Sequence, residues 1–281
     1  MIPNILMNAI CYNIPVSLIA AYPEQKIIIR ADDAADIVAN VTDKDLARIS
    51  FIKLLSLNGE IDSLIPWGHG IPVELVVSDP CRDLPLLYRY PSLLAGHPVR
   101  VSVPLVAGIG NVVKLAVALN FEVKLEGGQP DEGVLDELQW IAHFYLHQSR
   151  VSEPVEFFHS LFLAFYRLQP INLWTLQEED SSLVRHITDK GRVMMPGRLA
   201  GMEAREDFSA FILEMQKGLA AEKGECVDCE FLKYCQGYFK WPRREYRCDG
   251  VKALMSTLRS AGEELRADIA SFHSSGKNGF T

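Results

Sequence analysis

Four of the six cysteines lie close together in the C-terminal third of the chain, at Cys226, Cys229, Cys235 and Cys248. Thiolates are soft ligands, and four of them at one site select zinc or an iron–sulfur cluster. A structural zinc ribbon usually brings together two Cys-x2-Cys pairs, whereas here the first pair alone has that spacing. The spacing therefore favours an iron–sulfur cluster, and zinc or plain reduced thiols remain the alternatives.

The charges around these cysteines differ in sign from those of the whole chain. The 281 residues include 28 Lys and Arg and 36 Asp and Glu, which gives a net charge of −8 and an isoelectric point near 5.4. Residues 223–252 instead hold seven basic and five acidic side chains, a balance of +2. A local excess of positive charge is what a negatively charged cluster requires nearby.

The segment that begins at Cys226 resembles the C-terminal SPASM segment of radical SAM peptide maturases. Its sequence is CVDCEFLKYCQGYFKWPRREYRCDG. Those proteins usually hold two auxiliary [4Fe–4S] clusters. The family pattern is Cys-x2-Cys-x5-Cys-x3-Cys, with one further cysteine downstream and two upstream, the second of them in a Gly-x4-Cys step. The resemblance implies that the four clustered cysteines hold the outer cluster.

The ligands of the family's second cluster are missing from this chain. The fourth cysteine of the run falls on Phe239, and the Gly-x4-Cys step falls on Gly191 and Pro196. The resemblance therefore implies one [4Fe–4S] cluster instead of two.

Radical SAM enzymes bind their catalytic cluster through Cys-x3-Cys-x2-Cys, and this motif is also absent, since Cys11 and Cys81 stand 70 residues apart. We therefore expect no cleavage of S-adenosylmethionine and no independent enzyme. The chain is similar to the stand-alone SPASM component of GeoRSP-type peptide-modification systems.

The elements expected to position this site alternate between strand and helix in the first two thirds of the chain. Strands are predicted over residues 26–30, 72–78, 98–105, 121–125 and 171–176, and helices over 42–58, 111–119 and 131–147 and from residue 154. Such units imply parallel strands with right-handed crossovers. About five strands suit an open or partial α/β barrel better than a closed eight-stranded one. The resemblance implies that this part is a degenerate radical SAM-like barrel.

After residue 180 the pattern changes, so we expect an α/β domain over residues 1–180 and a SPASM-like iron–sulfur domain over 181–281. A hairpin is predicted over residues 186–195 and a helix from residue 203. The apolar stripe of this helix, at helical spacing, comprises Phe208, Phe211, Ile212, Met215 and Leu219. A last helix should face inward with Val251, Leu254, Leu258, Leu265 and Ile269, and its tail from residue 274 should fray.

Weaker motifs favour ordinary structural roles. Gly108-Ile-Gly110 lacks the third glycine of a dinucleotide fingerprint and is expected to be a strand–helix turn. The turn over residues 126–130 resembles the glycine-rich turn of radical SAM barrels and is expected to be a vestige or a plain loop. His143 and His147 share one helix face without the HExxH carboxylate and are expected to be solvated or hydrogen-bonded.

The composition narrows the partners and the compartment. An acidic chain argues against nucleic acid as a partner, because phosphate binding needs a clustered basic face. No window has the roughly 18 apolar residues of a membrane helix, and residues 1–22 lack a basic start and are not expected to be a secretory signal. We expect the reducing cytoplasm.

These observations together predict an accessory [4Fe–4S] protein. By resemblance it would act with a separate radical SAM maturase on a ribosomally made precursor peptide, as an electron relay or a docking component. The alternative is a scaffold protein that uses a structural four-cysteine zinc or iron–sulfur site to bind a partner.

Overall fold

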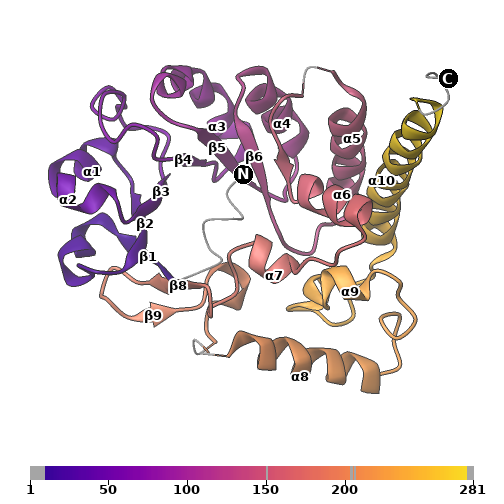
Figure 1. Ribbon diagram of the computed structural model, residues 1–281. Helices are drawn as coiled ribbons and strands as arrows, with labels where there is room; N and C mark the ends of the chain where they lie inside the picture. The colour runs from indigo at the N-terminus through magenta and orange to yellow at the C-terminus, as the bar shows by residue number, and fades with distance from the viewer. Residues whose placement is uncertain (1–9, 150, 203–204, 206, 277–281) are drawn as a thin grey trace.

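A computed structural model describes residues 10–149, 151–202, 205 and 207–276 (Figure 1). Within these residues nine strands form one sheet, in the order β7-β6-β5-β4-β3-β2-β1-β8-β9. All neighbouring strands pair in parallel except β8 and β9, which are antiparallel. The strands are β1 (Cys11–Pro15), β2 (Lys26–Ala31), β3 (Ile49–Leu54), β4 (Val73–Val76), β5 (Val99–Pro104), β6 (Glu122–Glu126), β7 (Val155–Glu156), β8 (Val184–Ile187) and β9 (Val193–Met194).

The helices lie mainly on the outer side of the curved sheet, and α7 to α9 lie below it in the view of Figure 1. They are α1 (Ala34–Asn40), α2 (Asp43–Leu46), α3 (Pro80–Asp83), α4 (Ile109–Ala118), α5 (Glu132–His147), α6 (Phe158–Arg167), α7 (Leu173–Leu176), α8 (Phe208–Ala221), α9 (Leu232–Cys235) and α10 (Asp249–Gly276). Short 3-10 helices include Gly197–Leu199 and Tyr238–Lys240. No helix in the described part of the chain is both long enough and apolar enough to span a membrane.

Each strand from β2 to β7 lies beside its predecessor in the chain. Within the described residues β7 and β9 form the two ends of the sheet, so the sheet is open. The expected α/β class with parallel strands is confirmed, and the number of strands is higher than the five expected.

The two faces of the sheet differ in chemistry because side chains alternate along a strand. The outer face is apolar and packs against the helices, as Ile52 and Val101 do. The inner face carries charged side chains that are nevertheless buried, among them Lys53, Glu74 and Arg100.

Two predicted elements were wrong, and the helix predicted from residue 154 begins only at Phe158, because Val155–Glu156 pairs with β6 as β7. The predicted helix over 42–58 ends at Leu46 after one turn, although its capping box with Thr42 and Asp45 is present. Ile49–Leu54 forms β3 instead, because every side chain of this run is buried between two parallel strands. The predicted strand over 171–176 is α7, whose first turn is capped by the Asn172 side chain on the Trp174 amide, 2.9 Å away.

The C-terminal elements agree better with the sequence. β8 and β9 form the predicted hairpin, and β8 also joins the main sheet beside β1. Helix α8 begins at Phe208 behind an Asp207 cap, and its expected stripe is buried. Residues 203, 204 and 206 lie outside the described residues.

Helix α10 buries only part of its predicted stripe. Val251, Leu254 and Leu258 are buried, but Leu265 and Ile269 are exposed, so the prediction was wrong for these two. The helix continues to Gly276, and residues 277–281 of the expected frayed tail lie outside the described part. One hydrophobic cluster includes residues on both sides of the expected boundary at residue 180.

Candidate metal centre

The four clustered cysteines line one pocket. Cys226 and Cys229 lie in the turn before α9, Cys235 ends α9, and Cys248 directly precedes α10. The rest of the lining is apolar apart from two lysines, and it comprises Phe231, Leu232, Gly237, Phe239, Lys240, Val251, Lys252 and Met255. The structure thus brings together the residues that the sequence singled out, although Cys248 is separated from Cys226 by more than 20 positions.

Local backbone geometry shapes the pocket around Cys235. The amide of Cys235 donates to the Phe231 carbonyl at 3.0 Å and closes the single turn of α9. Gln236 and Gly237 then both adopt positive φ angles, 49° and 78°, and reverse the chain. This reversal lets the amides of Gly237 and Tyr238 donate to the Cys235 sulfur. Such N–H···S bonds favour the thiolate that a metal requires.

Glu225 organises the charges beside the pocket. Its two carboxylate oxygens each lie 2.6 Å from an ammonium group, Oε1 from Lys240 Nζ and Oε2 from Lys252 Nζ. The Cys248 amide also donates to Oε1, at 3.1 Å. These partners lower the pKa of Glu225 to about 2 against the cost of partial burial. Glu225 therefore joins the turn of Cys226 to the start of α10.

The metal-free thiols are stabilised in their neutral form. Burial raises the pKa of Cys235 and of Cys248 to about 12, and it also raises the pKa of Cys226. Binding of a metal would displace these protons, since the thiolate is the ligand. The positive charge of Lys240 opposes the effect of burial at Cys226 and Cys248.

Among the described residues, no group of three or more His, Cys, Asp or Glu side chains is arranged to hold a metal ion. The four thiols nevertheless share one pocket. Four thiols can ligate either an iron–sulfur cluster or a zinc ion, and their side chains would have to rearrange to bind either one.

Arg198 joins the two segments that contain the positions expected to have lost the second cluster. Arg198, two residues after Pro196, donates from Nη1 to the carbonyls of Tyr238 and Trp241, at 2.9 and 2.7 Å. The same guanidinium lies 3.7 Å from the centre of the Tyr238 ring. Phe239 is buried beside Tyr238 and Phe157. The sequence analysis did not identify Arg198, because its partners lie some 40 residues away.

The glycine turn after β6 holds the cysteine segment. A Cβ atom on Gly127 would lie 1.8 Å from the Tyr238 hydroxyl oxygen, so only glycine fits against this buried ring. The Gln129 side-chain amide donates to the carbonyls of Phe239 and Arg243, at 2.9 and 2.7 Å. The turn is therefore a contact between the sheet and the candidate metal centre.

The inner face of the sheet carries a second polar assembly, which we call the inner-face ion cluster. Its members are Lys53 on β3, Glu74 on β4, Arg100 on β5, Lys124 on β6 and Glu178, which follows α7. Glu178 lies 2.6 Å from Lys53 Nζ, 3.0 Å from Arg100 Nη2 and 3.1 Å from Lys124 Nζ.

Glu74 completes the inner-face ion cluster through contacts with Lys53 and Arg100. The surrounding cations hold the pKa of Glu178 well below its ordinary value of 4.5 despite full burial. The sequence analysis did not identify this cluster, although Glu74, Arg100 and Lys124 alternate with apolar residues in the predicted strands.

The remaining motifs have structural partners. The amides of Gly108 and Gly110 both donate to the Glu137 carboxylate at 2.8 Å. This carboxylate therefore caps the start of α4. His143 and His147 lie on α5 with ring centres 4.4 Å apart. Cys11 is buried and Cys81 is exposed, and neither lines the cysteine pocket.

No protein-family model, curated protein or solved structure matches the chain.

Proposed function

We propose that this chain is an accessory iron–sulfur protein that holds one [4Fe–4S] cluster through Cys226, Cys229, Cys235 and Cys248. The observation that carries the proposal is the shared pocket of these four cysteines with Lys240 and Lys252. Two ammonium groups beside four thiolates would offset part of the negative charge of the site. The apolar remainder of the lining would limit access of water to the cluster.

The arrangement of the cysteines supports a cluster better than zinc. A zinc ion holds its thiolates at about 2.3 Å, so four sulfurs must converge tightly on one point. A cubane of several irons is larger and leaves its ligands farther apart. The ligands here come from the turn before α9, the end of α9 and the residue before α10, which suits a bulky cluster held from several sides.

The role that we propose is electron relay or docking for a separate radical SAM maturase acting on a precursor peptide. Four cysteine ligands leave no iron open to a substrate. We place the protein in the cytoplasm, because that compartment keeps thiols reduced and available as metal ligands.

The decisive experiment is anaerobic purification of the full chain with iron, zinc and sulfide analysis and Mössbauer spectroscopy. We expect about four irons and four sulfides per chain. One zinc without sulfide would overturn the cluster and support the scaffold alternative. An absence of both metals after reconstitution would overturn the metal centre itself.

Replacement of a ligand should remove the metal. In Cys235→Ala we expect loss of bound iron and of the cluster's visible absorption, together with weaker hydrogen-exchange protection at the start of α10, because metal binding and local folding are coupled. The matched control is Cys81→Ala, which changes an exposed cysteine outside the pocket and should keep the wild-type iron content. Equal iron content in both variants would contradict the ligand assignment.

A further inference from the structure

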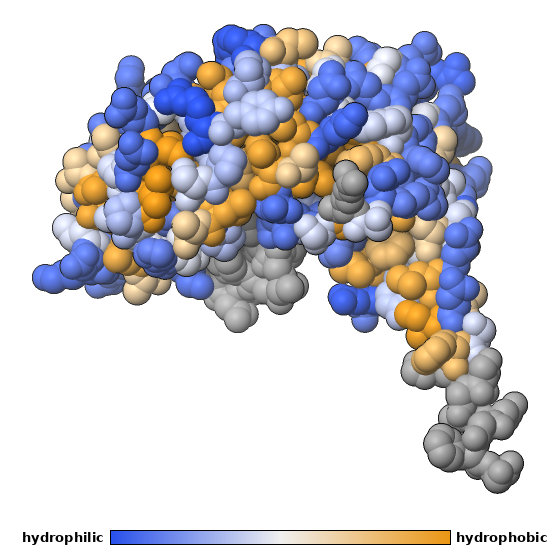
Figure 2. Space-filling model, turned by 90° about the horizontal axis from the view of Figure 1, so that it is seen from above, coloured by the Kyte–Doolittle hydropathy of each residue, from blue (hydrophilic) through white to orange (hydrophobic). Residues whose placement is uncertain are grey.

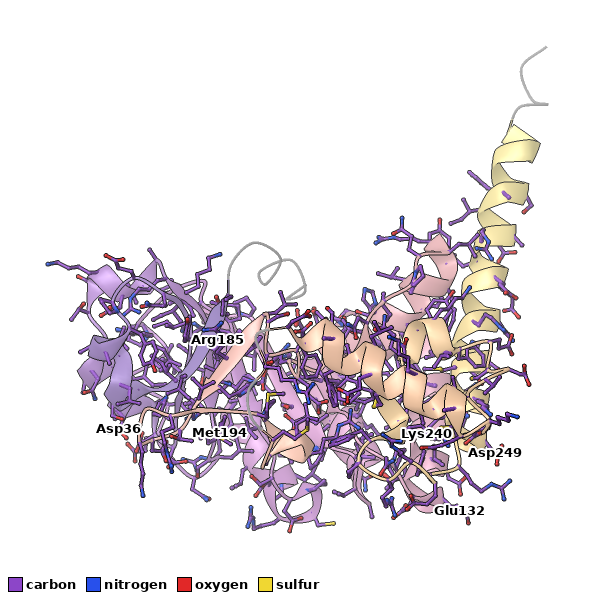
Figure 3. The ribbon with its side chains drawn as sticks, turned by 90° about the horizontal axis from the view of Figure 1, so that it is seen from below. Asp36, Glu132, Arg185, Met194, Lys240 and Asp249 are labelled. Atoms are coloured by element: carbon purple, nitrogen blue, oxygen red, sulfur yellow. The ribbon has the colours of Figure 1, made fainter. Side chains whose placement is uncertain are left out.

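Lys240 is a buried lysine beside the four candidate ligands. Lysine side chains usually end in water, and Figure 2 shows hydrophilic residues along most of the outline of the molecule. Lys240 is instead only 6% exposed and lines the cysteine pocket. Figure 3 shows it near Asp249, the residue that begins α10. A full positive charge therefore lies next to the thiols, largely out of reach of water.

The ammonium group of Lys240 is fixed in place. Its Nζ donates to Glu225 Oε1 at 2.6 Å and to the Tyr246 carbonyl. The backbone is held as well, because the Lys240 amide donates to the Gly237 carbonyl at 2.8 Å in the turn that follows Cys235. These contacts keep the charge beside the pocket.

Lys252 shares Glu225 with Lys240 but is more open to water. Its Nζ lies 2.6 Å from Glu225 Oε2, and its side chain is 31% exposed, against 8% for Lys240. The two ammonium groups and the one carboxylate leave a positive charge in excess. Because a charge acts more strongly where water does not screen it, most of the effect on the thiols comes from Lys240.

A cation at this position does not affect the two oxidation states of a cluster equally. A [4Fe–4S] cluster with four thiolate ligands carries two negative charges when oxidised and three when reduced. Reduction adds one electron to the irons and breaks no bond. A neighbouring positive charge therefore stabilises the reduced state more. The amides of Gly237 and Tyr238, which donate to the Cys235 sulfur, act in the same direction.

We propose that Lys240 raises the reduction potential of the [4Fe–4S] cluster and so suits it to accept an electron from a low-potential one-electron donor, such as a reduced iron–sulfur or flavin protein. The proposal rests on the cluster proposed above, and it selects electron relay over docking as the role of that cluster. A charge that separates the two oxidation states matters to a relay, whereas a docking component works equally well in either state.

The test measures the midpoint potential of the reconstituted full chain, by anaerobic titration with dithionite and redox mediators followed by EPR of the reduced cluster. In Lys240→Gln we expect the midpoint to fall by at least about 59 mV, which is a tenfold change in the equilibrium constant of a one-electron couple. The matched control is Lys233→Gln, which removes the same charge two residues from Cys235 but at an exposed side chain. Water and salt screen that charge, so the control should change the equilibrium constant less than about twofold. Equal midpoints in the two variants would overturn the proposal.

A second variant tests the same charge balance from the opposite side. Glu225→Gln removes the charge of the carboxylate and keeps its shape, so the midpoint should rise. This variant decides the matter where Lys240→Gln does not retain its cluster. An unchanged or lower midpoint in Glu225→Gln would overturn the proposal.

Iron and sulfide analysis separates this proposal from the function on which it rests. A wild-type chain that binds zinc or no metal overturns both. A wild-type chain with about four irons and four sulfides, whose midpoint does not depend on Lys240, keeps the cluster and overturns only the role of this lysine.

Discussion

At the scale of single residues, His186 shows how buried charge sets a protonation state. The Asn13 side-chain amide donates to His186 Nδ1 at 3.3 Å, and Nε2–H donates to the Glu178 carbonyl at 3.1 Å. Both bonds suit the neutral ring with its proton on Nε2. Burial and the positive charge of Lys53 lower the pKa of His186 to about 4 from its ordinary value of 6.5.

This lowered pKa predicts a stability loss on mild acidification. Between pH 6.5 and 4 the unfolded chain binds a proton at His186 and the folded chain does not. The free energy of unfolding therefore decreases as the pH is lowered through this range. We expect the fall to be steeper in the wild type than in His186→Gln, by up to about 1.4 kcal/mol per pH unit. Urea denaturation at a series of pH values measures both slopes. Parallel slopes would contradict a neutral buried ring.

At the scale of elements, the turn after β6 connects the sheet to the cysteine segment. Its backbone is also held from the other side, since the Gly127 amide donates to the Gln177 side chain at 2.9 Å. The Tyr246 hydroxyl donates to the Pro130 carbonyl at 2.8 Å. The turn is therefore a packed junction, and its shape decides where the cysteine segment lies.

The two glycines of this turn provide a matched pair of variants. Gly127→Ala would place its methyl group against the buried Tyr238 hydroxyl, and we expect the free energy of unfolding to fall by about 2 kcal/mol through overpacking. Gly128→Ala meets no atom within 4 Å of its Cβ and should change stability by less than about 0.5 kcal/mol. Chemical denaturation distinguishes the two, and a similar small effect in both variants would refute the close contact.

At the scale of the whole molecule, the inner-face ion cluster joins the sheet to the segment that follows α7. Its three cations, Lys53, Arg100 and Lys124, come from β3, β5 and β6. The Glu178 carboxylate that contacts all three lies outside those strands, between α7 and β8. The neighbouring Glu179 pairs with Arg198 at 3.0 Å, and Arg198 binds the segment of Tyr238. A continuous series of ionic and hydrogen-bonded contacts thus runs from the sheet to the candidate metal centre.

Loss of the central carboxylate should affect the entire fold. In Glu178→Ala the cations Lys53, Arg100 and Lys124 would remain buried without the Glu178 carboxylate. We therefore expect the free energy of unfolding to fall by about 3–5 kcal/mol. The control Glu214→Ala breaks an exposed ion pair with Arg205 and should cost less than about 1 kcal/mol. Thermal or urea denaturation compares them. Comparable losses in the two variants would contradict a central role for Glu178.

Local patterns in the sequence were enough for several elements and for the choice of candidate ligands. The run at residues 26–30 is β2, and the stripe from Phe208 to Leu219 is the buried face of α8. These patterns depend on neighbours a few positions away, and side-chain periodicity records them directly. The cysteine spacing likewise selected the four residues that share the pocket.

Long-range contacts decided the rest, because no local pattern specifies which segments meet. The burial of Ile49–Leu54 between two strands overrode a capping box that predicted a helix. Glu178 became the centre of the inner-face ion cluster through residues up to 125 positions away. The apolar period of α10 predicted one continuous buried face, yet the tertiary structure buries the first part of it, where α5 and α6 pack against the helix, and leaves Leu265 and Ile269 exposed.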